Sequence, residues 1–143
     1  MQSWVSYPHD AKAPFIITPP VYTLQENRQT LLHVIFTGDK NSLPADRESL
    51  FLANVKSVSA LSPDLKEKNT LQFAMKTRLK LFWRPAQLKE ADALGAYEKI
   101  TFHRQGDTLI ANNPTPFYVS FGELSVGGKS VPVKETKTTP GAI

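Results

Sequence analysis

The sequence predicts an all-β protein built as a β-sandwich. Short runs in which apolar and polar residues alternate are rich in β-branched and aromatic residues. Turn signals made of Gly, Pro, Asn and Asp separate these runs about every ten residues, as they do in sandwich folds. Of the 143 residues, 41% are hydrophobic, which is enough for a globular core.

The N-terminal part of the chain predicts short strands. The segments with β-type composition are residues 2–7, 15–18, 21–24 and 30–36. Pro19 and Pro20 end the second segment, and because prolines cannot donate to a β-ladder we expect it at a sheet edge or bend. Further along, Asp46 can cap one short helical turn, and the closeness of Glu48 and Ser49 to it in sequence indicates capping rather than catalysis. The β-branched Val55 and Val58 favour a strand from residue 53 to about residue 60.

The clearest pattern lies within residues 70–85, after a polar loop at residues 61–69. Large apolar side chains alternate from Leu71 to Leu81, with only Thr77 between them, and polar residues fill the other parity. This period of two predicts a strand longer than the usual length of about three to ten residues. Such a strand can pair over one half and leave the other half available to another chain. The alternative is an ordinary half-buried strand.

We place a domain boundary after Pro85, which divides the chain into residues 1–85 and 86–143. Small and charged residues at 86–97 indicate a linker with a turn of helix. Beyond it, Gly106 marks the tight turn of a hairpin. The strands predicted after the boundary are residues 100–104, 108–112, 117–126 and 129–133.

Composition and motifs exclude several classes of function. Lys and Arg exceed Asp and Glu by 17 to 13, but they are scattered, which argues against nucleic-acid binding. The chain has no cysteine, no apolar run of about 18 residues for membrane insertion, and an N-terminus that alternates like a strand rather than a signal peptide. His9, His33 and His103 lack metal-ligand spacing. With no phosphate loop or nucleophile elbow, we expect neither an enzyme nor a cofactor.

Residues 43–55, Leu-Pro-Ala-Asp-Arg-Glu-Ser-Leu-Phe-Leu-Ala-Asn-Val, resemble the signature of the PapD-like periplasmic pilus chaperones. Segments 2–5, 15–20, 69–74, 78–85 and 112–118 extend the resemblance in the family's order. Leu52 replaces a usual aromatic residue and Ser59 a common proline. The resemblance implies two immunoglobulin-like β-sandwich domains, both incomplete in this chain, which would lack its first strands, a cleft arginine and half of the second domain. We therefore expect these residues alone to be unstable and without chaperone activity.

The resemblance also implies a mechanism, in which the chaperone lends the last strand of its first domain to a pilus subunit that lacks one. Leu71, Phe73 and Met75 would be the donor residues, and Lys80 would bind the subunit's terminal carboxylate. The implied partners are fimbrial subunits and an outer-membrane usher, and the implied location is the periplasm. The short loop at residues 61–69 and the absence of cysteine resemble the short-loop branch of the family.

One geometric point is left open. Lys80 has the opposite parity from the donor residues, so a twist or bulge must lie between Met75 and Lys80 if they act together.

Two functions of other classes are the alternatives to a pilus chaperone. They are a generic immunoglobulin-like adhesion or structural module and a basic nucleic-acid binder.

Overall fold

The computed structural model describes residues 1–60, 71–132 and 137–138. The chain divides into two compact units. Unit 1 contains Met1–Ser42 and Leu50–Phe82, and unit 2 contains Leu43–Ser49 and Trp83–Ile143. The segment that carries Glu48 is therefore grouped with the second unit, although it lies well before Pro85 in the sequence.

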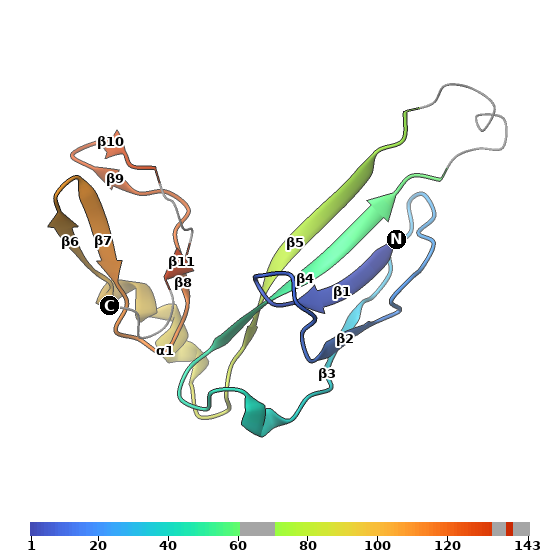
Figure 1. The fold of residues 1–143 in the computed structure, drawn as a ribbon, viewed down its shortest axis with the longest axis horizontal. Helices are drawn as coiled ribbons and strands as arrows, with labels where there is room; N and C mark the ends of the chain where they lie inside the picture. Colours follow the sequence, from blue (N-terminus) through green and yellow to red (C-terminus); the bar gives the residue numbers. More distant parts are fainter. Residues whose placement is uncertain (61–70, 133–136, 139–143) are drawn as a thin grey trace. The chain divides into compact units, whose positions relative to one another are not determined.

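Unit 1 contains a three-stranded sheet and a separate pair of strands. The sheet has the order β1-β4-β5, with β1 antiparallel to β4, and β2 pairs antiparallel with β3 (Figure 1). The bounds are β1 (Gln2–Ser6), β2 (Phe15–Thr18), β3 (His33–Phe36), β4 (Ser49–Val58) and β5 (Ala74–Trp83), with a 3-10 turn η1 (Lys40–Ser42) before β4.

An aromatic cluster joins the two layers of unit 1. Phe51 of β4 is 0% exposed, and its ring centroid lies 4.7 Å from that of Phe15 of β2. Tyr7 packs on Phe51 at 5.2 Å, and Phe36 of β3 packs on Phe15 at 5.0 Å. Tilted and edge-to-face rings at these distances attract one another beyond their buried area. The cluster therefore holds the three-stranded sheet against the β2-β3 pair.

Unit 2 consists of short helices and small hairpins. Its elements are α1 (Glu90–Leu94), η3 (Ala96–Lys99), β6 (Thr101–Gln105), β7 (Thr108–Asn112), β8 (Val119–Ser120), β9 (Ser125–Val126), β10 (Lys129–Ser130) and β11 (Lys137–Thr138). β6 pairs with β7 around Gly106, whose φ of 59° suits the tight turn. β9 pairs with β10, and β8 with β11. Among its described residues, Phe117 and Ala96 are the buried apolar ones.

Several predicted elements differ from the observed ones. The helical turn considered at Asp46 does not form, and its carboxylate instead accepts hydrogen bonds from Arg47 at 3.1 and 2.8 Å. β4 accordingly begins at Ser49, earlier than predicted, and pairs with β1 along part of its length. The strand predicted at residues 21–24 reduces to a single bridge between Val21 and Gln2. The segment predicted at 117–126 forms two separate strands, β8 and β9.

The long strand is shorter than predicted at its start. β5 begins at Ala74, so Leu71 and Phe73 precede it. Its neighbour β4 ends at Val58, and the next carbonyl, that of Ser59, accepts a hydrogen bond from the side-chain amide of Gln72 at 2.8 Å. The side-chain amide of Gln72 thus binds the Ser59 carbonyl, which a backbone N–H would bind if the β4-β5 ladder continued. The predicted loop at residues 61–69 lies outside the described residues.

We predict that Phe51→Ala lowers the free energy of unfolding by about 3–5 kcal/mol, because it removes a fully buried ring and leaves a cavity. Urea unfolding followed by circular dichroism measures the change. Ile16→Ala is the matched control, because Ile16 is exposed on β2. A loss for Phe51→Ala no larger than that for Ile16→Ala would contradict the role of the aromatic cluster.

Candidate functional site

β5 is an edge strand that carries exposed apolar side chains. The order β1-β4-β5 gives it one neighbour among the described strands, so its other backbone edge faces no strand there. Met75 within it is 70% exposed, and Leu71 and Phe73, just before it, are 79% and 71% exposed. An apolar row beside an open strand edge is a surface for adding another strand.

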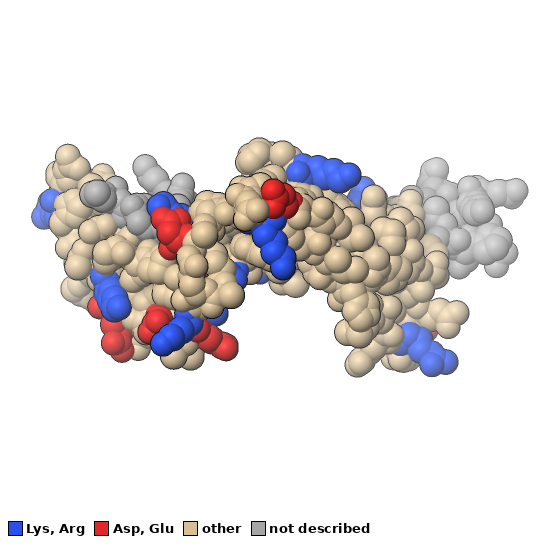
Figure 2. Space-filling view, turned by 90° about the horizontal axis from the view of Figure 1, so that it is seen from below, with Lys and Arg blue, Asp and Glu red and all other residues tan. Residues whose placement is uncertain are grey.

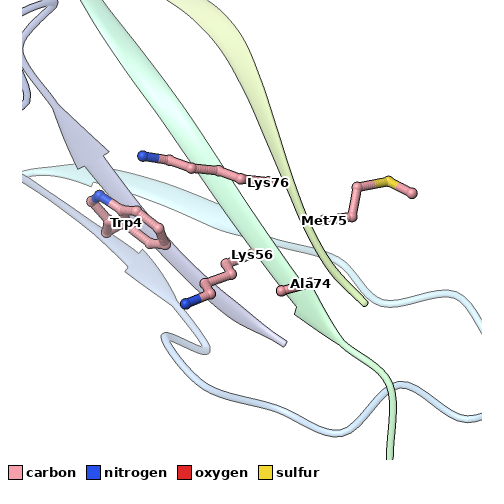
Figure 3. Close-up of a pocket in the computed structure, with 5 residues that line it drawn as sticks. All are labelled: Trp4, Lys56, Ala74, Met75 and Lys76. Atoms are coloured by element: carbon pink, nitrogen blue, oxygen red, sulfur yellow. The ribbon is translucent and has the colours of Figure 1, made fainter. Parts of the chain in front are cut away.

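The two sides of β5 differ in chemistry. Figure 3 shows Lys76 reaching across β4 toward Trp4, with Lys56 beside them, whereas Met75 points the other way. The Lys76 ammonium lies 5.1 Å from the centroid of the Trp4 ring, within range of a cation–π attraction. Trp4, Lys56, Ala74, Met75 and Lys76 line a cavity of about 260 Å³. The start of β5 is thus apolar on one side and cationic on the other.

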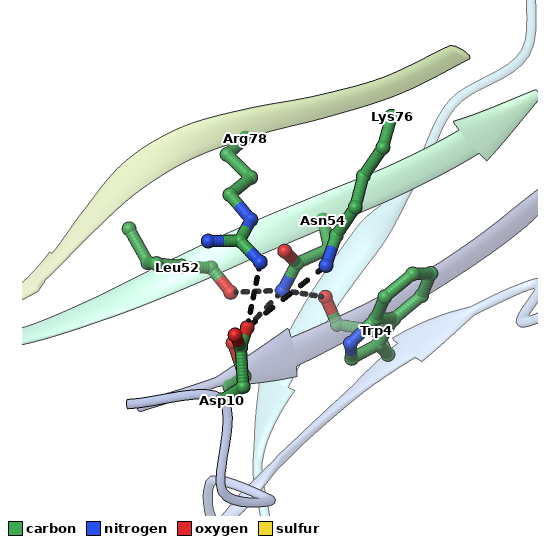
Figure 4. A network of polar contacts seen from close by, with 7 residues as sticks. Trp4, Asp10, Leu52, Asn54, Lys76 and Arg78 are labelled. Carbon is green, nitrogen blue, oxygen red and sulfur yellow. Dashed lines mark hydrogen bonds and ion pairs between the residues drawn. The ribbon is translucent and has the colours of Figure 1, made fainter. Parts of the chain in front are cut away.

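One carboxylate lies on the cationic side. Asp10 follows β1 with a φ of 65°, a conformation that Asp tolerates. Its Oδ1 accepts a hydrogen bond from Arg78 Nη2 at 2.8 Å and lies 3.9 Å from Lys76 Nζ (Figure 4). Beneath this contact, the buried Asn54 amide donates to the Ser6 hydroxyl at 3.0 Å. The loop after β1 is therefore tied to β5 across the middle of the sheet.

The structure places the predicted site residues on one segment. Met75 and Lys80 both lie on β5, and Leu71 and Phe73 immediately precede it. Lys80 is exposed and shares the parity of Lys76, opposite to that of Met75. β5 is visibly twisted along its length in Figure 1, which turns the directions of successive side chains.

A second polar cluster lies in unit 2. The Glu48 side chain is 3% exposed; its Oε1 accepts a hydrogen bond from Arg84 Nε at 2.7 Å and its Oε2 one from the Tyr118 backbone N–H at 2.9 Å. Burial, and then the Glu48 charge, raise the pKa of the Tyr118 phenol. The Arg84 guanidinium also lies 5.7 Å from the Phe117 ring centroid.

Glu48 was predicted to take part in helix capping, and no role of its own was predicted for Arg84. The available signal was their presence in two of the segments that carry the family resemblance. No pattern in the sequence pointed to Asp10, whose carboxylate contacts Arg78 and Lys76 in the structure.

Other kinds of site find no support in the described part of the chain. No group of three or more His, Asp or Glu residues is placed there to hold a metal ion, and no helix there is long and apolar enough to cross a membrane. Figure 2 shows the Lys and Arg side chains of one face as separate small groups rather than one continuous basic band.

Family models match both parts of the chain. Residues 1–89 match the pili and flagellar-assembly chaperone PapD N-terminal domain, and residues 95–142 match the pili assembly chaperone PapD C-terminal domain. The chain belongs to the PapD-like family of pilus-assembly chaperones. This confirms the resemblance and, with it, the predicted all-β fold with immunoglobulin-like domains.

Individual relatives agree with this assignment. The chain is 39% identical to chaperone protein LpfB of Salmonella typhimurium over 92% of its own length and 56% of the relative's. It is 38% identical to chaperone protein FimC of Escherichia coli K12, over 89% and 52%. The chain thus spans about half the length of these curated relatives. The SafB chaperone, solved with the SafA pilin of Salmonella enterica, superposes with a TM-score of 0.84 at 30% identity, over 99% of this chain and 66% of that one.

We predict that Glu48 and Arg84 are energetically coupled. In a double-mutant cycle with Glu48→Gln and Arg84→Met, each single variant should lower the free energy of unfolding, and the double variant little more, which gives a coupling of about 1.5–3 kcal/mol. Urea unfolding of the four proteins measures it. Asp46→Asn is the control and should change stability very little, because its pair with Arg47 is exposed. Additive losses would show that the buried pair is not a unit.

Proposed function

We propose that this chain is part of a periplasmic chaperone that captures fimbrial subunits by lending them β5 as a missing strand. The observation that carries the proposal is the exposed apolar row of Leu71, Phe73 and Met75 at the start of an edge strand. A subunit that lacks a strand has an open apolar groove with unpaired backbone groups on both sides. An edge strand can satisfy those groups while its apolar side chains fill the groove.

Lys80 is proposed to bind the terminal carboxylate of the captured subunit. It lies on the same strand as Met75, and the twist of β5 can bring the two residues to bear on one partner. A charge-assisted hydrogen bond from an ammonium to a carboxylate would fix the register of the added strand. Apolar contacts alone would allow the strand to slide by two residues.

The remaining parts of the proposal follow from family membership. Residues 1–85 and 86–143 would belong to the two immunoglobulin-like domains, and the protein would act in the periplasm with an outer-membrane usher. Its role would be binding, without catalysis. The related SafB chaperone was solved in complex with a pilin, which supports a fimbrial subunit as the partner of this chain.

We predict that Phe73→Glu, in the chain extended at both ends to the length of its relatives, abolishes recovery of a fimbrial subunit in a co-purification assay, because a charge in an apolar groove costs several kcal/mol, about as much as a strong interface contact contributes. Ile16→Glu is the matched control, because it adds the same charge at an exposed position of β2. It should leave recovery unchanged. Equal recovery with both variants would refute the donor strand and favour a generic immunoglobulin-like module.

We predict that Lys80→Met weakens subunit binding by a factor of about ten in Kd, because it keeps the side-chain length and removes the charge. Titration of a subunit with a free or an amidated C-terminus measures this loss. Amidation should weaken binding to the unmodified chaperone and have almost no effect on the variant. Lys40→Met, at an exposed lysine of η1, is the control. If amidation weakens binding to both proteins equally, Lys80 is not the partner of the carboxylate.

A further inference from the structure

We propose that the side of β5 opposite Met75 is a second recognition surface, which selects subunit strands carrying acidic residues at alternate positions. We call it the cationic face and define it by Trp4, Lys56, Lys76 and Arg78. The inference rests on the proposed function, because it requires a partner strand at the β5 edge. It adds the chemistry by which one subunit is preferred over another.

The cationic face presents hydrogen-bond donors. Lys56 of β4 and Lys76 of β5 line the cavity of about 260 Å³ together with the half-buried Trp4, whose indole N–H can only donate. Within the described part of the chain, no carboxylate pairs with Lys56, and the Trp4 indole N–H makes no hydrogen bond. Figure 3 shows both lysine side chains around the Trp4 ring. The cationic face therefore favours a partner that supplies hydrogen-bond acceptors and negative charge.

Asp10 shows that the cationic face holds a carboxylate. Its Oδ1 lies 2.8 Å from Arg78 and 3.9 Å from Lys76, although it comes from a loop distant in sequence. This carboxylate is itself more than half exposed. An acidic side chain from a partner can therefore reach the same cations and compete with it.

The spacing of the cations points to an extended peptide. Lys76 and Arg78 are two residues apart on one strand, which places their Cα atoms about 6.8 Å apart on the same side. A strand added at the β5 edge presents its own alternate side chains with the same repeat. Acidic residues at those positions lie on the same side of the sheet as Lys76 and Arg78, whose long side chains can turn from Asp10 toward them, while the intervening apolar residues lie on the side of Met75. We favour this partner over a nucleic acid because the cations follow strand spacing next to an open strand edge.

The test compares two peptides of equal length, blocked at both ends. In one, Val alternates with Glu, and in the other Val alternates with Thr. Calorimetric titration of the chain, extended at both ends to the length of its relatives, should give binding of both peptides, with the Val-Glu peptide tighter by a factor of about five. The double variant Lys76→Gln with Arg78→Gln should remove that preference and leave binding of the Val-Thr peptide unchanged. Lys40→Gln with Lys99→Gln, at exposed lysines that are not part of β5, should retain the preference.

A second variant should increase affinity. Asp10→Asn removes the competing charge and keeps a residue that tolerates a positive φ. It should bind the Val-Glu peptide more tightly, by a factor of about three, and the Val-Thr peptide as before. Because the variant gains binding, loss of folding cannot account for the result.

The outcomes separate the inference from the proposed function. If both peptides bind equally and Met75→Glu abolishes both, the donor strand stands and the inference is overturned. If neither peptide binds the unmodified chain, the donor-strand function and the inference are both contradicted. The inference would also be overturned if the Lys40 and Lys99 control removed the Val-Glu preference as fully as the Lys76 and Arg78 double variant does. Tighter binding of an oligothymidine than of the Val-Glu peptide would overturn it as well. A Val-Glu peptide with its Glu residues moved into one block should lose the preference.

Discussion

The packing of Phe51 is the contact on which unit 1 depends. Phe51 lies on β4, the middle strand of the β1-β4-β5 sheet, and touches aromatic rings from the other layer and from the loop after β1. With β4 fixed in this way, β5 is held along one edge, and no strand of the described part of the chain lies along its other edge. A strand that is to be offered to another chain needs such a support, because an isolated strand would not keep an extended conformation.

Local signals in the sequence predicted the elements whose causes are local. The hairpin around Gly106 and the strand ended by Pro19 were predicted because a glycine turn and consecutive prolines act within a few residues. The start of β5 was predicted wrongly. Alternation at Leu71 and Phe73 reports which way side chains can face, whereas a strand also needs a ladder partner, and β4 ends too early to supply one.

In the candidate site, too, features that depend on neighbouring residues were predicted and contacts between distant residues were not. The opposite parity of Met75 and Lys80 followed from counting along one strand. The contact of Asp10 with Arg78 joins residues 68 positions apart, and that of Glu48 with Arg84 joins residues 36 apart. A lone sequence contains no period or spacing that encodes such pairs, because each forms only once the chain has folded. Capping was therefore the plausible role for Glu48 until its burial was visible.

The positive charges on β5 also affect self-association of the chain. Two open strand edges of identical molecules can pair and start a growing aggregate. If two β5 strands met edge to edge, Lys76 and Arg78 of one copy would approach the like charges of the other, and the repulsion would oppose the pairing. An edge strand that can pair with other proteins is in this way hindered from pairing with a second copy of itself.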